Sequence, residues 1–247
     1  MTFPLQAFLA DLEPLINTDC GSRTPAGVAR IADLMTAHYA ALGWQVTRHQ
    51  FEAASGPCLE ITNAPGATQY DVMLSGHMDT VFPVGTAARR PLRVEGSTAY
   101  GPGVSDMKGG VLAMLYALRG LDPAVLARLK VVVCLNCDEE IGSPSSRDWL
   151  VATARKSRCV LVCEAARANG DLVKARKGNA KYRLAFHGKA AHAGTSLRDG
   201  ISAITELAHW TLAINGLVNF DTGTTLNVGM VQGGTGVNVV PDFAEAI

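Results

Sequence analysis

The sequence predicts an α/β protein with a mixed, mostly parallel sheet and helices on both faces, followed by a smaller α+β domain. Short apolar runs alternate with stretches of helical spacing, which is typical of strands buried on both faces. Hydrophobic residues make up 48% of the 247 residues and charged residues 18%, as in folded globular chains. Near Lys177 the continuous apolar runs give way to strands with one polar face.

The first part of the chain predicts alternating helices and strands. Apolar residues at helical spacing predict helices at 1–16, 24–43, 107–121 and 145–155. Short apolar or alternating runs predict strands at 44–51, 58–62, 71–77, 129–140 and 159–164. We interpret residues 1–176 as the N-terminal part of one α/β domain.

The remaining residues, 177–247, predict a different order of elements. The pattern indicates a strand, a helix and two further strands, at 179–189, 197–216, 224–234 and 237–247. The last strand stops at Ile247 without a cap, tail or turn. We therefore expect both domains to be incomplete and the natural protein to continue for roughly 100–150 residues, as a domain of usual size requires.

Charge and hydropathy argue against two classes of partner. The formal net charge is zero, so no basic excess exists to bind nucleic acid or an anionic membrane. No apolar run approaches the roughly 20 residues that cross a bilayer. The N-terminal helix carries Asp11 and Glu13 and lacks the basic start of a signal peptide. We expect a cytoplasmic protein.

The six cysteines predict neither a disulfide scaffold nor, as the favoured interpretation, a metal site. A chain of this length has a core that needs no disulfide scaffold. A four-cysteine zinc site built from Cys134, Cys137, Cys159 and Cys163 is an alternative. However, residues three apart on a strand point to opposite faces, so Cys134 and Cys137 do not converge easily. We expect buried thiols that pack as small hydrophobic side chains.

Charged residues recur where predicted strands or a Gly-rich loop end. They are His77, Asp79, Asp106, Asp138, Glu139, Glu140 and Glu164. Taken singly, each is more simply a solvated residue or, for Asp106, the cap of a helix that begins at Met107. At the carboxyl edge of a parallel sheet, however, all would converge. So much negative charge would be costly without compensation, which bound divalent cations would supply, and one imidazole with carboxylates suits zinc, or manganese or cobalt.

The motifs around these residues resemble a known family in sequence and in order. They are SGHMDTVFP (75–83), YGPGVSDMKGG (100–110), NCDEEIGS (136–143), VCE (162–164) and GKAAHAG (188–194). They are similar to those of the zinc-dependent exopeptidases that include carboxypeptidase G, aminoacylase and succinyl-diaminopimelate desuccinylase, and most similar to the glutamate carboxypeptidase type. The resemblance runs from about residue 15 to the end. It implies a zinc-exopeptidase-like fold and a homodimer formed through a lid domain.

The resemblance also implies metal ligands. They are His77, Asp106, Glu140 and Glu164. Asp106 would bridge two zinc ions roughly 3.5–4 Å apart, Glu164 would bind the first with His77, and Glu140 would bind the second. The family's further His ligand and its carboxylate-binding Arg have no counterpart up to residue 247.

Three catalytic residues and one substrate residue follow from the same resemblance. Asp79 would hold the His77 imidazole by a hydrogen bond, and Glu139 would be the general base. Neighbouring residues of an extended chain point apart, which would let Glu140 reach a metal while Glu139 addresses water. His192, otherwise a surface histidine, would steady the oxyanion in the partner subunit's site. Asn238 would lie near the substrate.

The implied activity is amide hydrolysis by a metal-bound hydroxide, releasing a C-terminal amino acid such as glutamate from a small peptide or N-acyl donor. An N-acyl-amino-acid deacylase is the nearest alternative. A non-catalytic dimerisation or binding fragment is another, although the intact Glu139 argues against it. A nucleotide-binding protein is least favoured, because the Gly-rich loop lacks the G-x-G-x-x-G spacing and the Walker Lys-Ser/Thr pair.

Overall fold

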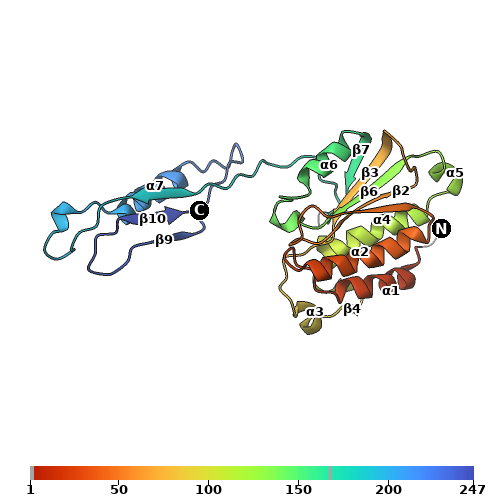
Figure 1. The fold of residues 1–247 in the computed structure, drawn as a ribbon, viewed down its shortest axis with the longest axis horizontal. Helices are drawn as coiled ribbons and strands as arrows, with labels where there is room; N and C mark the ends of the chain where they lie inside the picture. Colours follow the sequence, from red (N-terminus) through yellow and green to blue (C-terminus); the bar gives the residue numbers. More distant parts are fainter. Residues whose placement is uncertain (1–2, 167–168) are drawn as a thin grey trace. The chain divides into compact units, whose positions relative to one another are not determined.

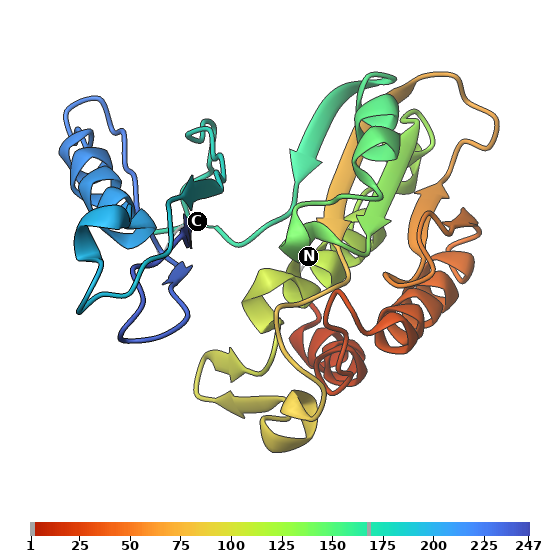
Figure 2. The ribbon, with the colours of Figure 1, turned by 60° about the vertical axis from the view of Figure 1, so that its left-hand side comes forward.

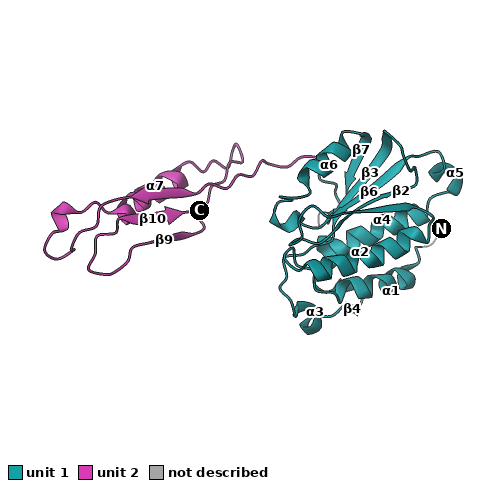
Figure 3. Cartoon of the chain, viewed as in Figure 1, with its two compact units in different colours: residues 1–173 teal, residues 174–247 magenta. Residues whose placement is uncertain are grey.

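The computed structural model describes residues 3–166 and 169–247, in two compact units formed by residues 1–173 and 174–247 (Figure 3). The first unit contains a five-stranded sheet and a two-stranded one, and the second a three-stranded sheet. The domain limits 1–176 and 177–247 remain a prediction for the whole protein. No helix within these described residues has the length and apolar character needed to span a membrane.

The five-stranded sheet confirms the predicted mixed, mostly parallel arrangement. Its strands follow the order β1-β2-β6-β3-β7. They are β1 (Gln45–His49), β2 (Cys58–Thr62), β3 (Tyr70–His77), β6 (Val131–Asn136) and β7 (Ser157–Val162). β2 is antiparallel to β1 and to β6, whereas β3 is parallel to β6 and to β7. β2 is therefore the one strand of this sheet that runs against the others.

The register of the parallel strands brings their carboxyl ends level. His77 at the end of β3 pairs with Asn136 at the end of β6, and Ser75 pairs with Val162 at the end of β7. Every residue of β6 is buried, so this strand lies in the middle of the core. The segments that follow β3, β6 and β7 consequently leave the sheet at the same edge.

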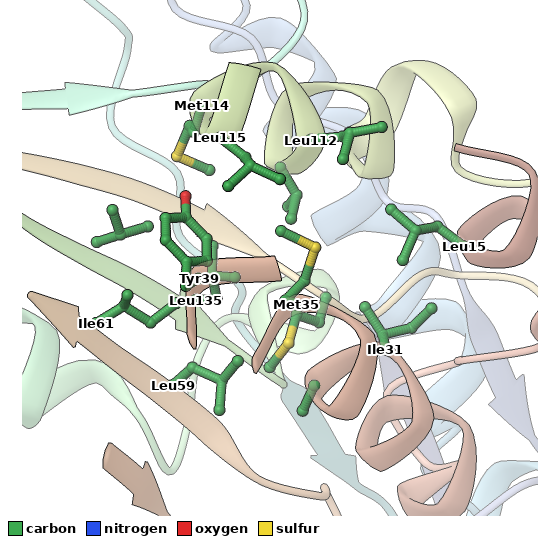
Figure 4. Close-up of a cluster of buried hydrophobic side chains, with 14 of the residues drawn as sticks. Leu15, Ile31, Met35, Tyr39, Leu59, Ile61, Leu112, Met114, Leu115 and Leu135 are labelled. Atoms are coloured by element: carbon green, nitrogen blue, oxygen red, sulfur yellow. The ribbon is translucent and has the colours of Figure 1, made fainter. Parts of the chain in front are cut away.

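Helices cover both faces of this sheet, as predicted (Figure 1). On one face lie α1 (Leu5–Ile16), α2 (Pro25–Ala40) and α4 (Gly109–Arg119), and on the other lies α6 (Arg147–Ala154). The buried side chains of α2 recur at helical spacing and pack against β2, β6 and α4 (Figure 4). Proline at the start of α2 fits the helix's first turn, where no N–H partner is needed.

Two features of the first unit differ from the predicted pattern. β7 was expected to be buried, but Val160, Leu161 and Val162 are 40%, 51% and 64% exposed, because β7 is an edge strand. Between β3 and α4 the chain also forms a short helix and a hairpin that the apolar pattern did not indicate: α3 (Thr86–Arg89), β4 (Arg93–Glu95) and β5 (Thr98–Tyr100) (Figure 2). Another short helix, α5 (Pro123–Leu126), precedes β6.

The second unit confirms the smaller α+β pattern. Its antiparallel sheet has the order β8-β10-β9, formed by β8 (Leu184–His187), β10 (Phe243–Ala246) and β9 (Val231–Gly233). Helix α7 (Ala203–Gly216) packs on it through Ala203 and Leu207. The helix begins later than predicted, because the Ser202 hydroxyl accepts a hydrogen bond from the backbone N–H of Thr205 and caps it there.

Candidate metal centre

His77 is the centre of a cluster drawn from four segments of the first unit. Its side chain is 1% exposed and stands at the end of β3. The imidazole Nε2 lies 3.0 Å from a carboxylate oxygen of Asp106, 3.4 Å from one of Glu164 and 3.9 Å from one of Glu139. The structure therefore brings together residues that are far apart in the sequence.

Two groups of three side chains in the described residues have the spacing of metal ligands. One is His77, Asp106 and Glu140, and the other is His77, Glu139 and Glu164, with ligand atoms within 4.8 Å of one another in each group. Neither group contains a cysteine. All four predicted ligands occur, but Glu139 shares the second group with Glu164. Proximity alone thus leaves the division between ligand and general base a prediction.

Asp106 lies in a tight turn and not at a helix cap. The turn η1 spans Val104–Lys108, and the Asp106 backbone is non-helical at φ −122° and ψ 99°. Helix α4 begins only at Gly109, and no side chain caps it. A Cβ at Gly110 would lie 2.1 Å from the carbonyl oxygen of Cys163. Glycine there lets the start of α4 lie directly against the segment that carries Glu164.

Glu139 and Glu140 lie in a 3₁₀ turn, η2 (Glu139–Ile141), so the expectation of an extended chain is wrong. This turn forms because one carboxylate accepts hydrogen bonds from the backbone N–H groups of both glutamates. The N–H of Glu139 donates to Asp79 Oδ1 at 3.1 Å, and the N–H of Glu140 donates to Asp79 Oδ2 at 3.2 Å. The two glutamates nevertheless join different groups of candidate ligands.

Asp79 is fully buried and contacts His77 twice. The His77 Nδ1 lies 3.0 Å from the backbone carbonyl of Asp79 and 3.3 Å from its carboxylate. The same carboxylate accepts a 2.6 Å hydrogen bond from the Ser22 hydroxyl. Asp79 therefore joins the imidazole, the Glu139–Glu140 turn and an N-terminal segment. Ser22 stands 57 residues from Asp79 and in none of the quoted motifs, so no sequence pattern indicated its role.

Asp138, one of the charged residues at the predicted strand ends, organises the chain after the 3₁₀ turn. Its buried carboxylate accepts hydrogen bonds from the backbone N–H and hydroxyl groups of Ser145 and Ser146. Burial raises the pKa of Asp138, but these hydrogen bonds outweigh burial and lower it. Its backbone carbonyl also accepts from the N–H of Ser143 at 2.7 Å. Asp138 thereby closes the loop that carries Glu139 and Glu140.

The electrostatics of the cluster favour a bound cation. Burial lowers the pKa of His77, but hydrogen bonds to Asp79 and Glu164 outweigh it and raise the pKa to about 11. Burial, followed by the charge of Asp106, raises the pKa of Glu140 to about 7. Burial is also the largest cause of the raised pKa of Glu139. Burial thus raises the pKa of the glutamates most and neighbouring carboxylates add to this, whereas hydrogen bonds to carboxylates raise the pKa of His77. Imidazole nitrogen with carboxylate oxygens is a donor set that fits zinc, manganese or cobalt.

His192 and Asn238 lie side by side in the second unit. The residues around them form a short antiparallel bridge, in which the N–H of Ala193 donates to the Asn238 carbonyl at 2.9 Å. His192 is exposed, and its Nδ1 accepts from the N–H groups of Gly194 and Thr195 at 3.1 and 3.2 Å. A neutral imidazole held this way carries its proton on Nε2. His192 thus offers an N–H donor from an exposed loop.

Four of the six cysteines are buried, and two are not. Cys20, Cys58, Cys134 and Cys137 are buried, as expected. Cys159 is exposed and Cys163 half-buried, because both belong to or follow the edge strand β7. The Sγ atoms of Cys58 and Cys137 lie 3.4 Å apart, so Cys137 packs against β2 and not against Cys134.

Comparisons with known proteins identify the family of this chain. Residues 73–232 match Peptidase family M20/M25/M40. The chain is 31% identical over 240 residues to carboxypeptidase G2 of Pseudomonas sp. (strain RS-16), covering 96% of this chain and 58% of that protein. It is 27% identical over 258 residues to acetylornithine deacetylase of Myxococcus xanthus, covering 98% of this chain and 66% of that protein.

Solved structures share the fold. A tripeptidase from Staphylococcus aureus matches with a TM-score of 0.70 at 20% identity, covering 100% of this chain and 66% of that one. An M20 family metallo-carboxypeptidase from Sulfolobus solfataricus matches with a TM-score of 0.62 at 15% identity, covering 97% and 69%. The chain spans only 49% to 66% of the length of four curated relatives, among them the carboxypeptidase and the deacetylase named above. Because the family match covers more than half of its residues, this chain belongs to peptidase family M20/M25/M40.

Proposed function

We propose that the protein containing this chain is a dinuclear metal hydrolase that cleaves an amide bond and releases a C-terminal amino acid such as glutamate. The observation that carries the proposal is the convergence of the buried His77 imidazole with carboxylates from three other segments. The substrate class rests on the 31% identity to carboxypeptidase G2 over 96% of the chain. Zinc is the metal we propose, with cobalt or manganese as substitutes.

His77, Asp106, Glu140 and Glu164 would hold the two metals, with Asp106 shared between them. Bound divalent cations would supply Lewis-acid polarisation of the scissile carbonyl and acidify water. The donor set supports binding of a metal here, since each group in the described residues joins His77 to two carboxylates at ligand spacing, and Asp106 belongs to one of these groups. Burial of His77 and Asp79 keeps this side of the cluster dry, which strengthens its electrostatic interactions.

Glu139 would be the proton carrier. Its carboxylate stands 3.9 Å from His77 Nε2 and is half exposed, so it reaches both the cluster and a substrate from solvent. It would accept a proton from the attacking water and deliver it to the leaving amine. Asp79 would orient His77 and the Glu139 backbone together, because its carboxylate contacts both.

His192 and Asn238 would act on the substrate from the second unit. The Nε2–H of His192 is suited to donate to a developing oxyanion, and Asn238 lies next to it on the same short bridge. We propose that His192 serves the site of a partner subunit, in a homodimer formed through the domain that begins at residue 177. A cytoplasmic location is part of the same proposal.

A second candidate reaction is the deacylation of an N-acyl amino acid. The observation that favours it is the 27% identity to acetylornithine deacetylase over 98% of the chain. Both reactions hydrolyse an amide and would use the same residues, so the substrate's acyl group and the amino acid that is released are what separate them.

The test compares two substrates on the metal-loaded protein. Initial rates of amino-acid release would be measured with a peptide ending in glutamate and with N-acetylornithine. We expect kcat/KM for the glutamate peptide to be about a hundredfold higher, since specificity for a matched side chain commonly has that size. The reverse order would support the deacylase, and the absence of chelator-sensitive release from either substrate would sink the proposed reaction.

A further inference from the structure

The hydroxyl of Ser22 lies within the hydrogen-bond network of the candidate metal centre, although no motif pointed to it. Ser22 Oγ donates to Asp79 Oδ2 at 2.6 Å, and the two side chains belong to residues 6% and 0% exposed. A buried carboxylate is stable in its ionised form only when hydrogen bonds replace its lost hydration. Ser22 supplies the shortest of those bonds to Asp79.

The two carboxylate oxygens of Asp79 have different hydrogen-bond partners. Oδ1 faces the His77 Nδ1 at 3.3 Å and the N–H of Glu139 at 3.1 Å. Oδ2 accepts from Ser22 and from the N–H of Glu140 at 3.2 Å. Ser22 therefore fixes the rotation of the carboxylate that holds both glutamate amides. Without it, the Asp79 carboxylate loses its shortest hydrogen bond and keeps only the longer contacts to His77, Glu139 and Glu140, so the Glu139–Glu140 turn is held less firmly.

Ser22 is itself held in place by backbone contacts. Its N–H donates to the Thr80 carbonyl at 3.3 Å, and the N–H of Thr80 donates to the Cys20 carbonyl at 3.0 Å. Gly21 forms a parallel bridge with Thr80, and a Cβ at Gly21 would lie 2.8 Å from the Phe82 carbonyl oxygen. Only glycine permits this close approach of the two chains. The N-terminal segment is thus locked to the chain that follows Asp79.

We propose that Ser22 is a positioning residue of this site, which acts through the Asp79 carboxylate to hold the Glu139–Glu140 turn in its working geometry. The inference deepens the proposed function, on which its catalytic consequence rests. Its structural consequence, protection of the two glutamate amides, holds whether or not the assayed substrates are the right ones.

The first measurement does not depend on catalytic activity. Hydrogen exchange of the peptide that contains Glu139 and Glu140 would be followed in the metal-free full chain, in wild type and in Ser22→Ala. We expect these amides to exchange about tenfold faster in Ser22→Ala, because loss of a local support lowers the free energy of local opening. Ser55→Ala is the matched control, since Ser55 is fully buried and its hydroxyl contacts Glu52 outside the site. Unchanged exchange in Ser22→Ala overturns the proposal.

The second measurement separates positioning from a general loss of stability. With the metal-loaded protein, we expect kcat of Ser22→Ala to fall about tenfold while KM stays within about twofold, as for other groups that orient metal-site residues. Ser22→Thr keeps the hydroxyl and should recover most of the lost kcat. An unchanged kcat in Ser22→Ala overturns the proposal. If wild type shows no turnover but Ser22→Ala still speeds exchange, the positioning role stands and the proposed reaction fails.

Discussion

His77 and His192 are the two histidines assigned to this protein's chemistry, and the two units hold them in opposite ways. His77 is buried; its Nδ1 contacts Asp79, two positions away, but its Nε2 contacts Asp106 and Glu164, which stand 29 and 87 positions away in the sequence. His192 is exposed, and its ring accepts hydrogen bonds from residues only two and three positions away. The first arrangement depends on the whole sheet, whereas the second depends on one loop. Changes in the two regions should therefore have different signatures.

The largest expected effect concerns Glu139, and it decides whether this residue is a base or a ligand. In Glu139→Gln we expect kcat to fall about a thousandfold, because general acid–base catalysis contributes on that scale. Zinc content, measured by elemental analysis after dialysis, should be unchanged. Glu13→Gln, an exposed change on α1, is the control. Loss of zinc together with activity would show that Glu139 is a ligand, as its place in the second candidate group permits.

Replacing His192 should reduce activity less than replacing Glu139, and it should leave the first unit folded. In His192→Ala we expect kcat to fall about a hundredfold, the usual cost of removing one oxyanion donor. Zinc content and Tm should stay the same, because the side chain is exposed. His209→Ala, an exposed change on α7, is the control.

A mixture of the two inactive variants tests whether His192 serves the partner's site. In a mixed dimer of Glu139→Gln and His192→Ala, one site would contain both wild-type residues. We expect about a quarter of wild-type activity from a random mixture of two-fold symmetric dimers. No recovery after subunit exchange would place His192 in its own subunit's site or outside the site altogether.

Asp138 should affect stability more than chemistry. In Asp138→Asn we expect the free energy of unfolding of the first unit to fall by about 2 kcal/mol, since an amide cannot accept all the hydrogen bonds that the carboxylate accepts from Ser145 and Ser146. Urea unfolding followed by tryptophan fluorescence in a Trp210→Phe background would report the first unit through Trp44 and Trp149. Asp199→Asn, exposed in the second unit, should leave this transition unchanged. A shift below the error of the fit would contradict the buried-network interpretation.

Replacing Asn238 should change the kinetic constants least. In Asn238→Ala we expect KM to rise about threefold with kcat nearly constant, as when a contact is made equally in the ground and transition states. The side chain is exposed and only its backbone carbonyl joins the bridge to Ala193, so Tm should not change. Asn227→Ala, also exposed in this unit, is the control. A fall in kcat with constant KM would instead assign Asn238 to the transition state.

Much of the fold and the candidate cluster could be predicted because each signal is local. A continuous apolar run predicted β6, and helical spacing predicted α2, without knowledge of their neighbours. The predicted ligands stand directly after such strands or in a Gly-rich loop, where parallel pairing brings them to one edge. The buried environment of β7 was predicted wrongly, because an apolar run does not show whether a strand lies at the edge or the centre of a sheet.

By itself the sequence determined which residue types stand at the strand ends, their order along the chain and their family. The strands and helices follow from composition and from the period of a strand or helix, which a few neighbouring residues specify, and the family follows from the resemblance of the ordered motifs. Only the tertiary structure decided that Glu139 and Glu140 form a 3₁₀ turn, and that Ser22 joins Asp79 across 57 residues. Those contacts arise from the packing of distant segments, and no local pattern of the chain encodes them.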